Sequence, residues 1–214
     1  MTVTVTGAEA AGRAVARRHR DGPSAAEPDR SRSLLNYAES AHDGDWTLRS
    51  ALVRLAQPDP ARVGALLEVM RRLDGPLHHV ARTLERHTVV ADAVLDPAAV
   101  EGPVQQPVAD VRTADLARLV AAGFDPDGVI RGYDAEVGPD LGPLGNEERL
   151  AVPLLALAVD LDRLAAALTA WASSGPADPP VEVLDATRAR VLARLDELGV
   201  PVETGPPPGA GRRR

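Results

Sequence analysis

His42 and Asp43 are adjacent, and Asp45 follows two residues later, so imidazole and carboxylate groups gather in one short segment. A divalent cation accepts this mixture of ligands, but its site needs at least one more ligand from elsewhere in the chain. The only histidine before the pair is His19, which lies in an arginine-rich segment that we expect to be disordered. The pattern therefore favours a polar loop in which Asp45 caps the following helix.

The same His-Asp pair leaves one enzymatic alternative open. All-helical HD-type phosphohydrolases bind their metal through an adjacent His-Asp pair together with a distant His and Asp. A metal-dependent HD-type phosphohydrolase is therefore our second alternative function, although we assign no metal-binding residue.

Three further histidines, His78, His79 and His87, fall on one predicted helix. A metal-binding pair on a helix needs a spacing of three or four residues, and Arg82 and Thr83 stand at those distances after His79. The spacing predicts a solvated or hydrogen-bonded histidine face rather than a metal centre.

The composition removes several kinds of chemistry. The chain of 214 residues contains no cysteine, and all 24 of its basic residues are arginine. Disulfides, thiolate metal sites, cysteine nucleophiles, Schiff bases and a phosphate-binding lysine are thereby excluded. Aromatic residues make up only 2%, so the core must be aliphatic.

The charge is unevenly distributed. The net charge is −7 overall, but residues 1–32 carry +2 and residues 205–214 carry +3, which leaves −12 on residues 33–204. An acidic body repels a phosphate backbone, so we expect nucleic acid to bind at most weakly through the arginine-rich ends. We predict a disordered basic tail over 1–32, one helical domain over 33–200, and a disordered Pro/Gly/Arg tail over 201–214.

Neither a membrane span nor a secretory signal is expected. No apolar run approaches the ~20 residues that a spanning helix needs. The first six residues have no charged segment before an apolar one. We therefore expect no membrane association and a cytoplasmic protein.

Proline and glycine divide the first half of the body into predicted helices. A short helix is possible over 33–41, and a second begins after Asp45 and stops at Pro58. The next begins at Pro60 and ends at Gly75, and Pro76 opens a further one.

The second half of the body has the clearer helical signals. Thr113 and Asp125 are predicted caps of two helices, and a last helix spans about 181–198. The strongest signal begins at Asn146, where apolar residues at alternating steps of four and three form a three-heptad stripe that ends at Trp171. We predict a central core helix there, with a dimer seam as the alternative, and Pro153 should kink it or move its start later.

The segment between the two halves is ambiguous. Residues 88–95 could extend the preceding helix or form a short strand. Residues 96–112 contain three prolines and read as a loop with extended stretches near Val104 and Val108. The predicted fold class is therefore mainly α, a single helical domain with a long central helix and at most a minor strand pair.

Residues 87–172 contain a characteristic order of short motifs. They are Asp110-Val-Arg-Thr-Ala-Asp115-Leu116-Ala117, Phe124-Asp125-Pro126-Asp127, Gly132-Tyr133, Glu147-Glu148-Arg149, and Pro153-Leu154-Leu155 in a long helix ending at Trp171. In this order of features the segment resembles the C-terminal lobe of the aminoglycoside phosphotransferase and homoserine kinase-like family. The family's metal-binding Asp precedes an Asp-Leu-Ala helix, so the resemblance places Asp110 at that position.

The chain differs from this family at the residues that carry out catalysis. The family's catalytic loop reads His-Gly-Asp, then four residues, then Asn, and its acidic and amide side chains orient the acceptor and hold magnesium. His87 matches the His, but Val89 stands in place of the Asp and Val94 in place of the Asn. The family's phosphate-pairing lysine has no counterpart either, so we expect no kinase activity.

These observations favour a non-catalytic helical binding or scaffold protein, and an active phosphotransferase-like enzyme for a small hydroxylated or cationic substrate is the first alternative. We expect a protein partner or a second copy of the chain, allow a small-molecule ligand, and expect no cofactor, metal or catalytic residue. The candidate ligand- or partner-binding residues are His87, Asp110, Asp115, Tyr133, Asp134 and Trp171.

Overall fold

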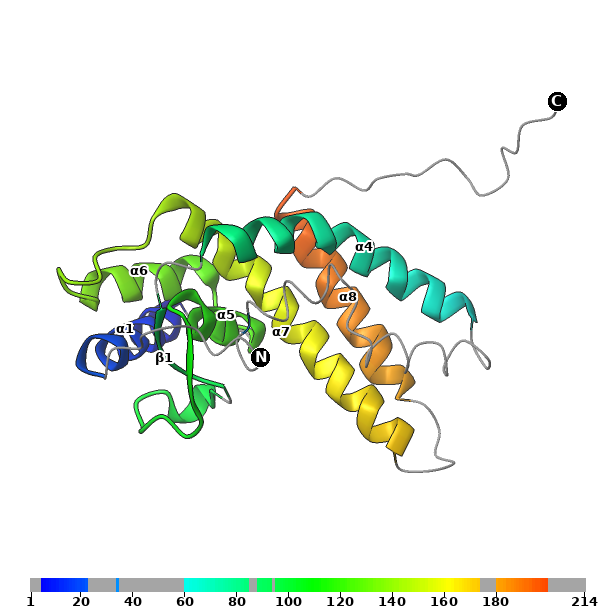
Figure 1. Ribbon diagram of the computed structural model, residues 1–214, viewed down its shortest axis with the longest axis horizontal. Helices are drawn as coiled ribbons and strands as arrows, with labels where there is room; N and C mark the ends of the chain where they lie inside the picture. The colour runs from blue at the N-terminus through cyan, green and yellow to red at the C-terminus, as the bar shows by residue number, and fades with distance from the viewer. Residues whose placement is uncertain are drawn as a thin grey trace.

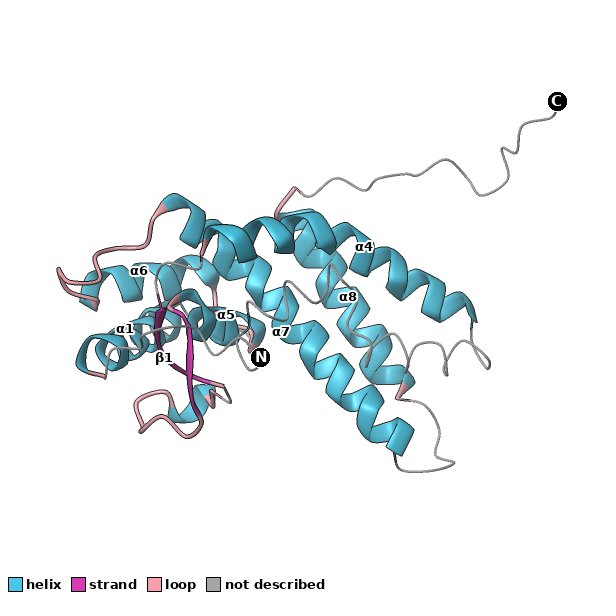
Figure 2. Cartoon of the chain, viewed as in Figure 1, coloured by secondary structure: helices cyan, strands magenta, loops and turns pink. Residues whose placement is uncertain are grey.

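The fold is mainly α-helical, as predicted. The computed structural model describes residues 5–22, 34, 60–84, 88–93, 95–173 and 180–199. In these residues the helices, labelled as in Figure 1, are α1 (Val5–Asp21), α4 (Pro60–Thr83), α5 (Thr113–Ala121), α6 (Pro126–Glu136), α7 (Asn146–Ser173) and α8 (Val181–Glu197). The remaining elements are β1 (Thr88–Asp92), a 3-10 turn η1 (Pro97–Ala99) and β2 (Pro107–Val111). Figure 2 shows the small strand pair beside this helical body.

Helix α7 is the central element. It contacts α4, α5, α6 and α8, and in Figure 1 it runs from the α1, α5 and α6 end of the molecule along the length of α8. Leu157, Leu161, Leu164 and Leu168 on its apolar stripe are all fully buried, as a core helix requires. Pro153 lies inside the helix and does not move its start later, because α7 already begins at Asn146.

Helix α4 corrects one prediction. Gly75 and Pro76 do not separate two helices, because α4 continues through both. The helix has buried apolar residues on both sides of Pro76, namely Leu73 before it and Leu77 and Val80 after it. Packing of this continuous apolar face outweighs the cost of about 3 kcal/mol for an interior proline.

The ambiguous segment forms a hairpin. β1 pairs with β2 in antiparallel register, with Val89 opposite Asp110 and Ala91 opposite Val108. The Asp92 carboxylate accepts hydrogen bonds from the backbone N–H groups of Gln105 and Gln106, both at 3.0 Å. Asp92 thereby fixes where the chain returns to the second strand.

Helix α1 contradicts the prediction of a disordered tail over 1–32. Residues Val5–Asp21 form a helix whose Ala8, Ala11, Val15 and Ala16 are buried against the rest of the fold, chiefly against α6. Alanine is small enough to let two helices approach closely, so this face buries little side-chain bulk and gave a poor apolar signal in the sequence.

The predicted helix caps have mixed outcomes. Asp125 caps α6 as expected, accepting a hydrogen bond from the Gly128 N–H at 2.7 Å. Thr113 and Asn146 are instead the first residues of their helices. The predicted helix after Asp45, the His42-Asp43 pair and the predicted tail over 201–214 lie outside the described residues, as does all of 33–41 except residue 34. No helix in the described part of the chain is long and apolar enough to cross a membrane.

Candidate functional site

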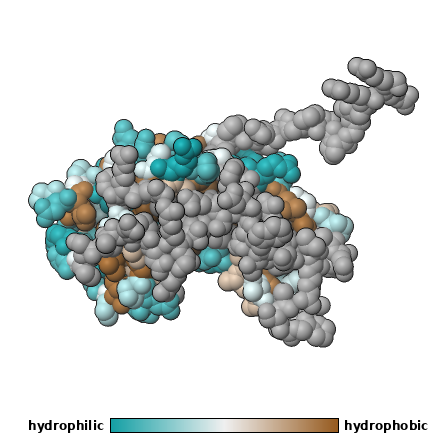
Figure 3. Space-filling view, in the orientation of Figure 1, coloured by the Kyte–Doolittle hydropathy of each residue, from teal (hydrophilic) through white to brown (hydrophobic). Residues whose placement is uncertain are grey.

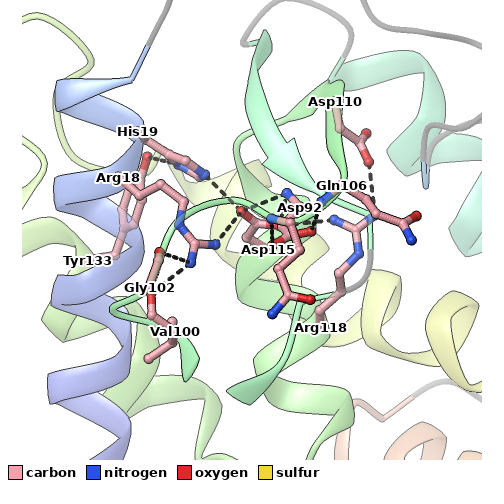
Figure 4. Close-up of polar contacts among 11 residues, drawn as sticks. Arg18, His19, Asp92, Val100, Gly102, Gln106, Asp110, Asp115, Arg118 and Tyr133 are labelled. Atoms are coloured by element: carbon pink, nitrogen blue, oxygen red, sulfur yellow. Dashed lines mark hydrogen bonds and ion pairs between the residues drawn. The ribbon is translucent and has the colours of Figure 1, made fainter. Parts of the chain in front are cut away.

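The predicted site residues Asp110, Asp115 and Tyr133 meet in one buried polar cluster. The cluster lies where the C-terminal turn of α1 reaches the β1–β2 hairpin, α5 and α6 (Figure 4). Asp115, in the first turn of α5, is its centre. One carboxylate oxygen accepts from the Asp92 backbone N–H and from Arg118 Nη1, both at 3.1 Å, and the other lies 3.3 Å from His19 Nε2.

His19 connects Asp115 to Tyr133. Its Nδ1 lies 3.1 Å from the Tyr133 hydroxyl, and the two rings meet edge to face with centroids 5.7 Å apart. Both contacts are hydrogen bonds when Nε2–H donates to the Asp115 carboxylate and Nδ1 accepts a hydrogen bond from the Tyr133 hydroxyl. The result is a Tyr-His-Asp chain that spans α6, α1 and α5.

Arg118 joins Asp110 to the same cluster. Its Nη2 lies 3.3 Å from the Asp110 carboxylate while its Nη1 donates to Asp115. Asp110 also accepts from the backbone N–H groups of Leu34 at 2.9 Å and Val111 at 2.8 Å. One guanidinium therefore bridges two buried carboxylates, and backbone N–H groups donate further hydrogen bonds to both of them.

Arg18 ties the end of α1 to the hairpin connection. Its Nη2 donates to the carbonyl oxygens of Val100 at 2.8 Å and Gly102 at 3.1 Å (Figure 4). Its Nη1 lies 3.9 Å from Asp115, close enough for charge attraction but too far for a hydrogen bond.

The cluster shifts two proton equilibria. Burial alone raises the pKa of Asp115, but the hydrogen bond and electrostatic attraction of the His19 ring and the charge of Arg118 outweigh it and hold that pKa below its ordinary value. Burial raises the pKa of the Tyr133 hydroxyl, so this tyrosine stays protonated at physiological pH. Asp115 is therefore ionised at physiological pH, and Tyr133 is a neutral hydrogen-bond donor.

The remaining predicted site residues do not join the cluster. Asp134 accepts from Arg149 and from the Leu144 backbone N–H at 2.8 Å, which fixes the loop before α7. Trp171 is partly buried against the core near the other end of α7. His87 lies outside the described residues.

A second buried ion pair lies beside the cluster and was not predicted. Arg112 holds Glu148 in a two-point contact, with Nε–Oε1 2.6 Å and Nη2–Oε2 2.5 Å. The same guanidinium donates to the carbonyl oxygens of Leu141 and Gly142. It thereby fixes the start of α7 and the preceding loop to the end of β2.

Sequence reasoning missed the residues that connect the predicted ones. The prediction of a disordered tail included His19 and Arg18, because Ala8, Ala11 and Val15 have helical spacing but give only a weak apolar signal. Arg118 follows Asp115 by three residues, the distance of an ion pair on one helix, and this spacing could have been recognised.

The cluster is built to hold the fold. Asp110, Asp115 and Tyr133 are each 0% exposed, so no solvent-borne substrate reaches them in this arrangement. No group of three or more His, Asp or Glu side chains within the described ranges is arranged to hold a metal ion. A proton could pass along Tyr133, His19 and Asp115, but neither end of that chain reaches solvent.

The open surface is elsewhere, around Leu150. This residue is 65% exposed, and it lines two adjoining hollows of about 410 and 600 Å³. The smaller hollow lies among α4, α7 and the end of α8, and the larger among α6, α7 and α8; Leu198 lines both. On the described part of the face in Figure 3, apolar surface occurs only as separate patches between hydrophilic areas.

The comparisons with known proteins give no relative: no protein-family model, no curated protein and no solved structure matches this chain.

Proposed function

We propose that this chain is a non-catalytic helical binding protein that takes a protein partner at the surface around Leu150. One observation carries the proposal. The polar residues best suited to chemistry are enclosed and bonded to one another, while a large leucine stands exposed between two hollows. Exposed apolar residues within concave surface are typical of interaction sites.

The resemblance to a phosphotransferase C-terminal lobe is consistent with this proposal. It assigns Asp110 to metal binding, and here Arg118 and two backbone N–H groups hold that carboxylate. A side-chain cation inside the fold now offsets the charge that the family directs toward its cofactor. We infer a lobe whose former reaction site has become internal structure.

A photo-crosslinking residue placed at Leu150 tests the proposal in the cells that make this protein. Val183 on α8 is the matched control, because it is also a large exposed apolar residue, at 42%. We expect a crosslinked product of discrete mass from position 150 and none from position 183. Equal labelling from the two positions, or no product from either, would contradict a binding role for the Leu150 surface.

A further inference from the structure

The apolar stripe of α7 does not stop where the core stops. Leu157 and Leu161 are fully buried, but Leu154 and Leu150, about one and two turns before Leu157 on the same stripe, line the smaller hollow. Leu154 is partly buried and packs against the core, so the open end of the stripe joins directly onto it. A second helix laid along this end would extend the core packing of α7 outward.

Negative charge borders this open end. Glu147 lines the smaller hollow, and Asp127 and Glu197 line the larger one. All three are exposed, and none has an ion-pair or hydrogen-bond partner in the part of the chain that the structure describes. They come from α7, α6 and α8, so the acids surround Leu150 from three elements.

The arginines at the same surface are already engaged. Arg131 pairs with Glu9 at 3.1 Å, Arg149 with Asp134, and Arg194 donates to the Val120 carbonyl at 3.4 Å. Arg194 keeps its positive charge, because a carbonyl oxygen does not neutralise a guanidinium, but three exposed acids against this one arginine leave the net charge open to a partner negative.

Resting on the proposed function, we infer that the occupant of the Leu150 surface is a basic amphipathic helix of a partner protein. Its apolar face covers Leu150 and Leu154, and its lysine or arginine side chains meet Glu147, Asp127 and Glu197. Apolar contact supplies affinity, and the flanking charges select the partner and speed its association.

A second copy of this chain is the poorer occupant. Paired face to face, two copies would bring the same three acids against one another, in a protein whose net charge is already −7. Like charges facing each other across an interface disfavour the pair. The acids around Leu150 therefore favour a basic partner helix over a second copy of this chain.

Synthetic helical peptides of about 18 residues test this inference with the full-length protein. One has a leucine face flanked by lysine and arginine, a second has the same face flanked by glutamate, and a third is the basic peptide with serine in place of leucine. Fluorescence anisotropy would be measured at low and high salt with the wild type, Leu150→Ser, and the control Val183→Ser.

We expect the basic leucine peptide to bind at least ten-fold more tightly than the other two, with a preference over the acidic peptide that shrinks in high salt. Leu150→Ser should weaken it ten-fold or more and Val183→Ser should not. The triple variant Glu147→Gln, Asp127→Asn, Glu197→Gln should remove most of the preference for basic over acidic peptide. Circular dichroism confirms that each variant is folded.

The other outcomes overturn the inference and separate it from the proposed function. Equal or tighter binding of the acidic peptide, still lost in Leu150→Ser, refutes the basic partner but keeps the Leu150 surface. If the basic peptide binds Leu150→Ser as tightly as it binds the wild type, the Leu150 surface is not the binding site. If sedimentation shows that the wild type forms dimers and Leu150→Ser does not, the occupant of the surface is a second copy of this chain and the basic helix is refuted. If no peptide binds, the basic helix is refuted, and crosslinking at position 150 then decides the proposed function alone.

Discussion

Gly12 of α1 and Gly132 of α6 lie where the two helices touch backbone to backbone. A Cβ on Gly12 would stand 2.1 Å from the Val129 carbonyl oxygen, and a Cβ on Gly132 would stand 2.1 Å from the Glu9 carbonyl oxygen. Neither helix can carry a side chain here without moving the other. This reciprocal contact sets the depth at which α1 docks, and with it the position of His19 over Asp115.

Alanine at either glycine should therefore destabilise the protein. We expect Gly12→Ala or Gly132→Ala to lower the free energy of unfolding by about 1–3 kcal/mol or more, because the new methyl group displaces α1. Chemical denaturation followed by circular dichroism measures the change. Gly64→Ala is the matched control: that glycine is exposed within α4 with nothing within 4 Å of an added Cβ, so the variant should gain up to about 1 kcal/mol. Equal effects at the three positions would contradict the close approach.

The Tyr133 hydroxyl should stabilise the fold through His19. Tyr133→Phe leaves the buried Nδ1 of His19 without its donor, and we expect a loss of about 1–3 kcal/mol. His19→Phe should cost at least as much, because it also removes the contact with Asp115. A double-mutant cycle should show that the two losses are not additive. Additive losses would mean that the two side chains act independently. His79→Ala, at an exposed position, should change stability by less than about 0.5 kcal/mol.

Asp115 should make the protein sensitive to acid. Its pKa in the fold lies below the ordinary 3.8, so its stabilising contribution is complete above that value and is lost as the pH falls through the folded pKa. Asp115→Asn should be less stable than the wild type at pH 7. The wild type should then lose more stability than the variant between pH 5 and pH 2. A constant difference across that range would contradict the conclusion that Asp115 is ionised in the folded protein.

Asp160 should destabilise the fold at neutral pH, whereas Asp115 stabilises it. It lies 1% exposed on α7, with its Oδ1 3.5 Å from Arg190 and 4.0 Å from Arg163. Burial raises its pKa despite these arginines, so the fold favours the protonated carboxyl. A raised folded pKa means that stability is lost as the pH rises through it.

Asp160→Asn should consequently be more stable than the wild type at pH 7. The advantage should vanish below the ordinary pKa of 3.8, where the wild-type carboxyl is protonated in both the folded and unfolded chain. Denaturation curves over this pH range give the measurement, and Asp140→Asn, at an exposed loop position, should show no such trend. A less stable Asp160→Asn at neutral pH would show that the pairs with Arg190 and Arg163 outweigh the cost of burial.

Features of the fold that depend on residues close together in the chain could be predicted from the sequence. The stripe from Leu157 to Leu168 and the cap at Asp125 were recognisable because helix periodicity and capping depend on neighbours a few residues apart. Pro76 was misread for the same reason, since only packing against other helices keeps α4 continuous through it.

The candidate site depended on distant contacts. Asp110, Asp115 and Tyr133 could be selected, but the side chain that links the last two, His19, lies 96 residues from Asp115 in sequence. Its place is set by the Gly12–Gly132 contact, which depends on the absence of side chains. An Ala/Gly helix face carries too little hydrophobic signal for such a docking site to be found in advance.

Isothermal titration of the full-length protein with magnesium and ATP tests the central claim most directly. We expect no saturable heat, because Asp110 and Asp115 are enclosed and held by Arg118, His19 and backbone N–H groups. A dissociation constant below about 1 mM, or ~4 kcal/mol of binding free energy, that disappears in a folded Asp110→Asn variant would contradict it. That result would return Asp110 to a nucleotide site and make the phosphotransferase-like enzyme the better account.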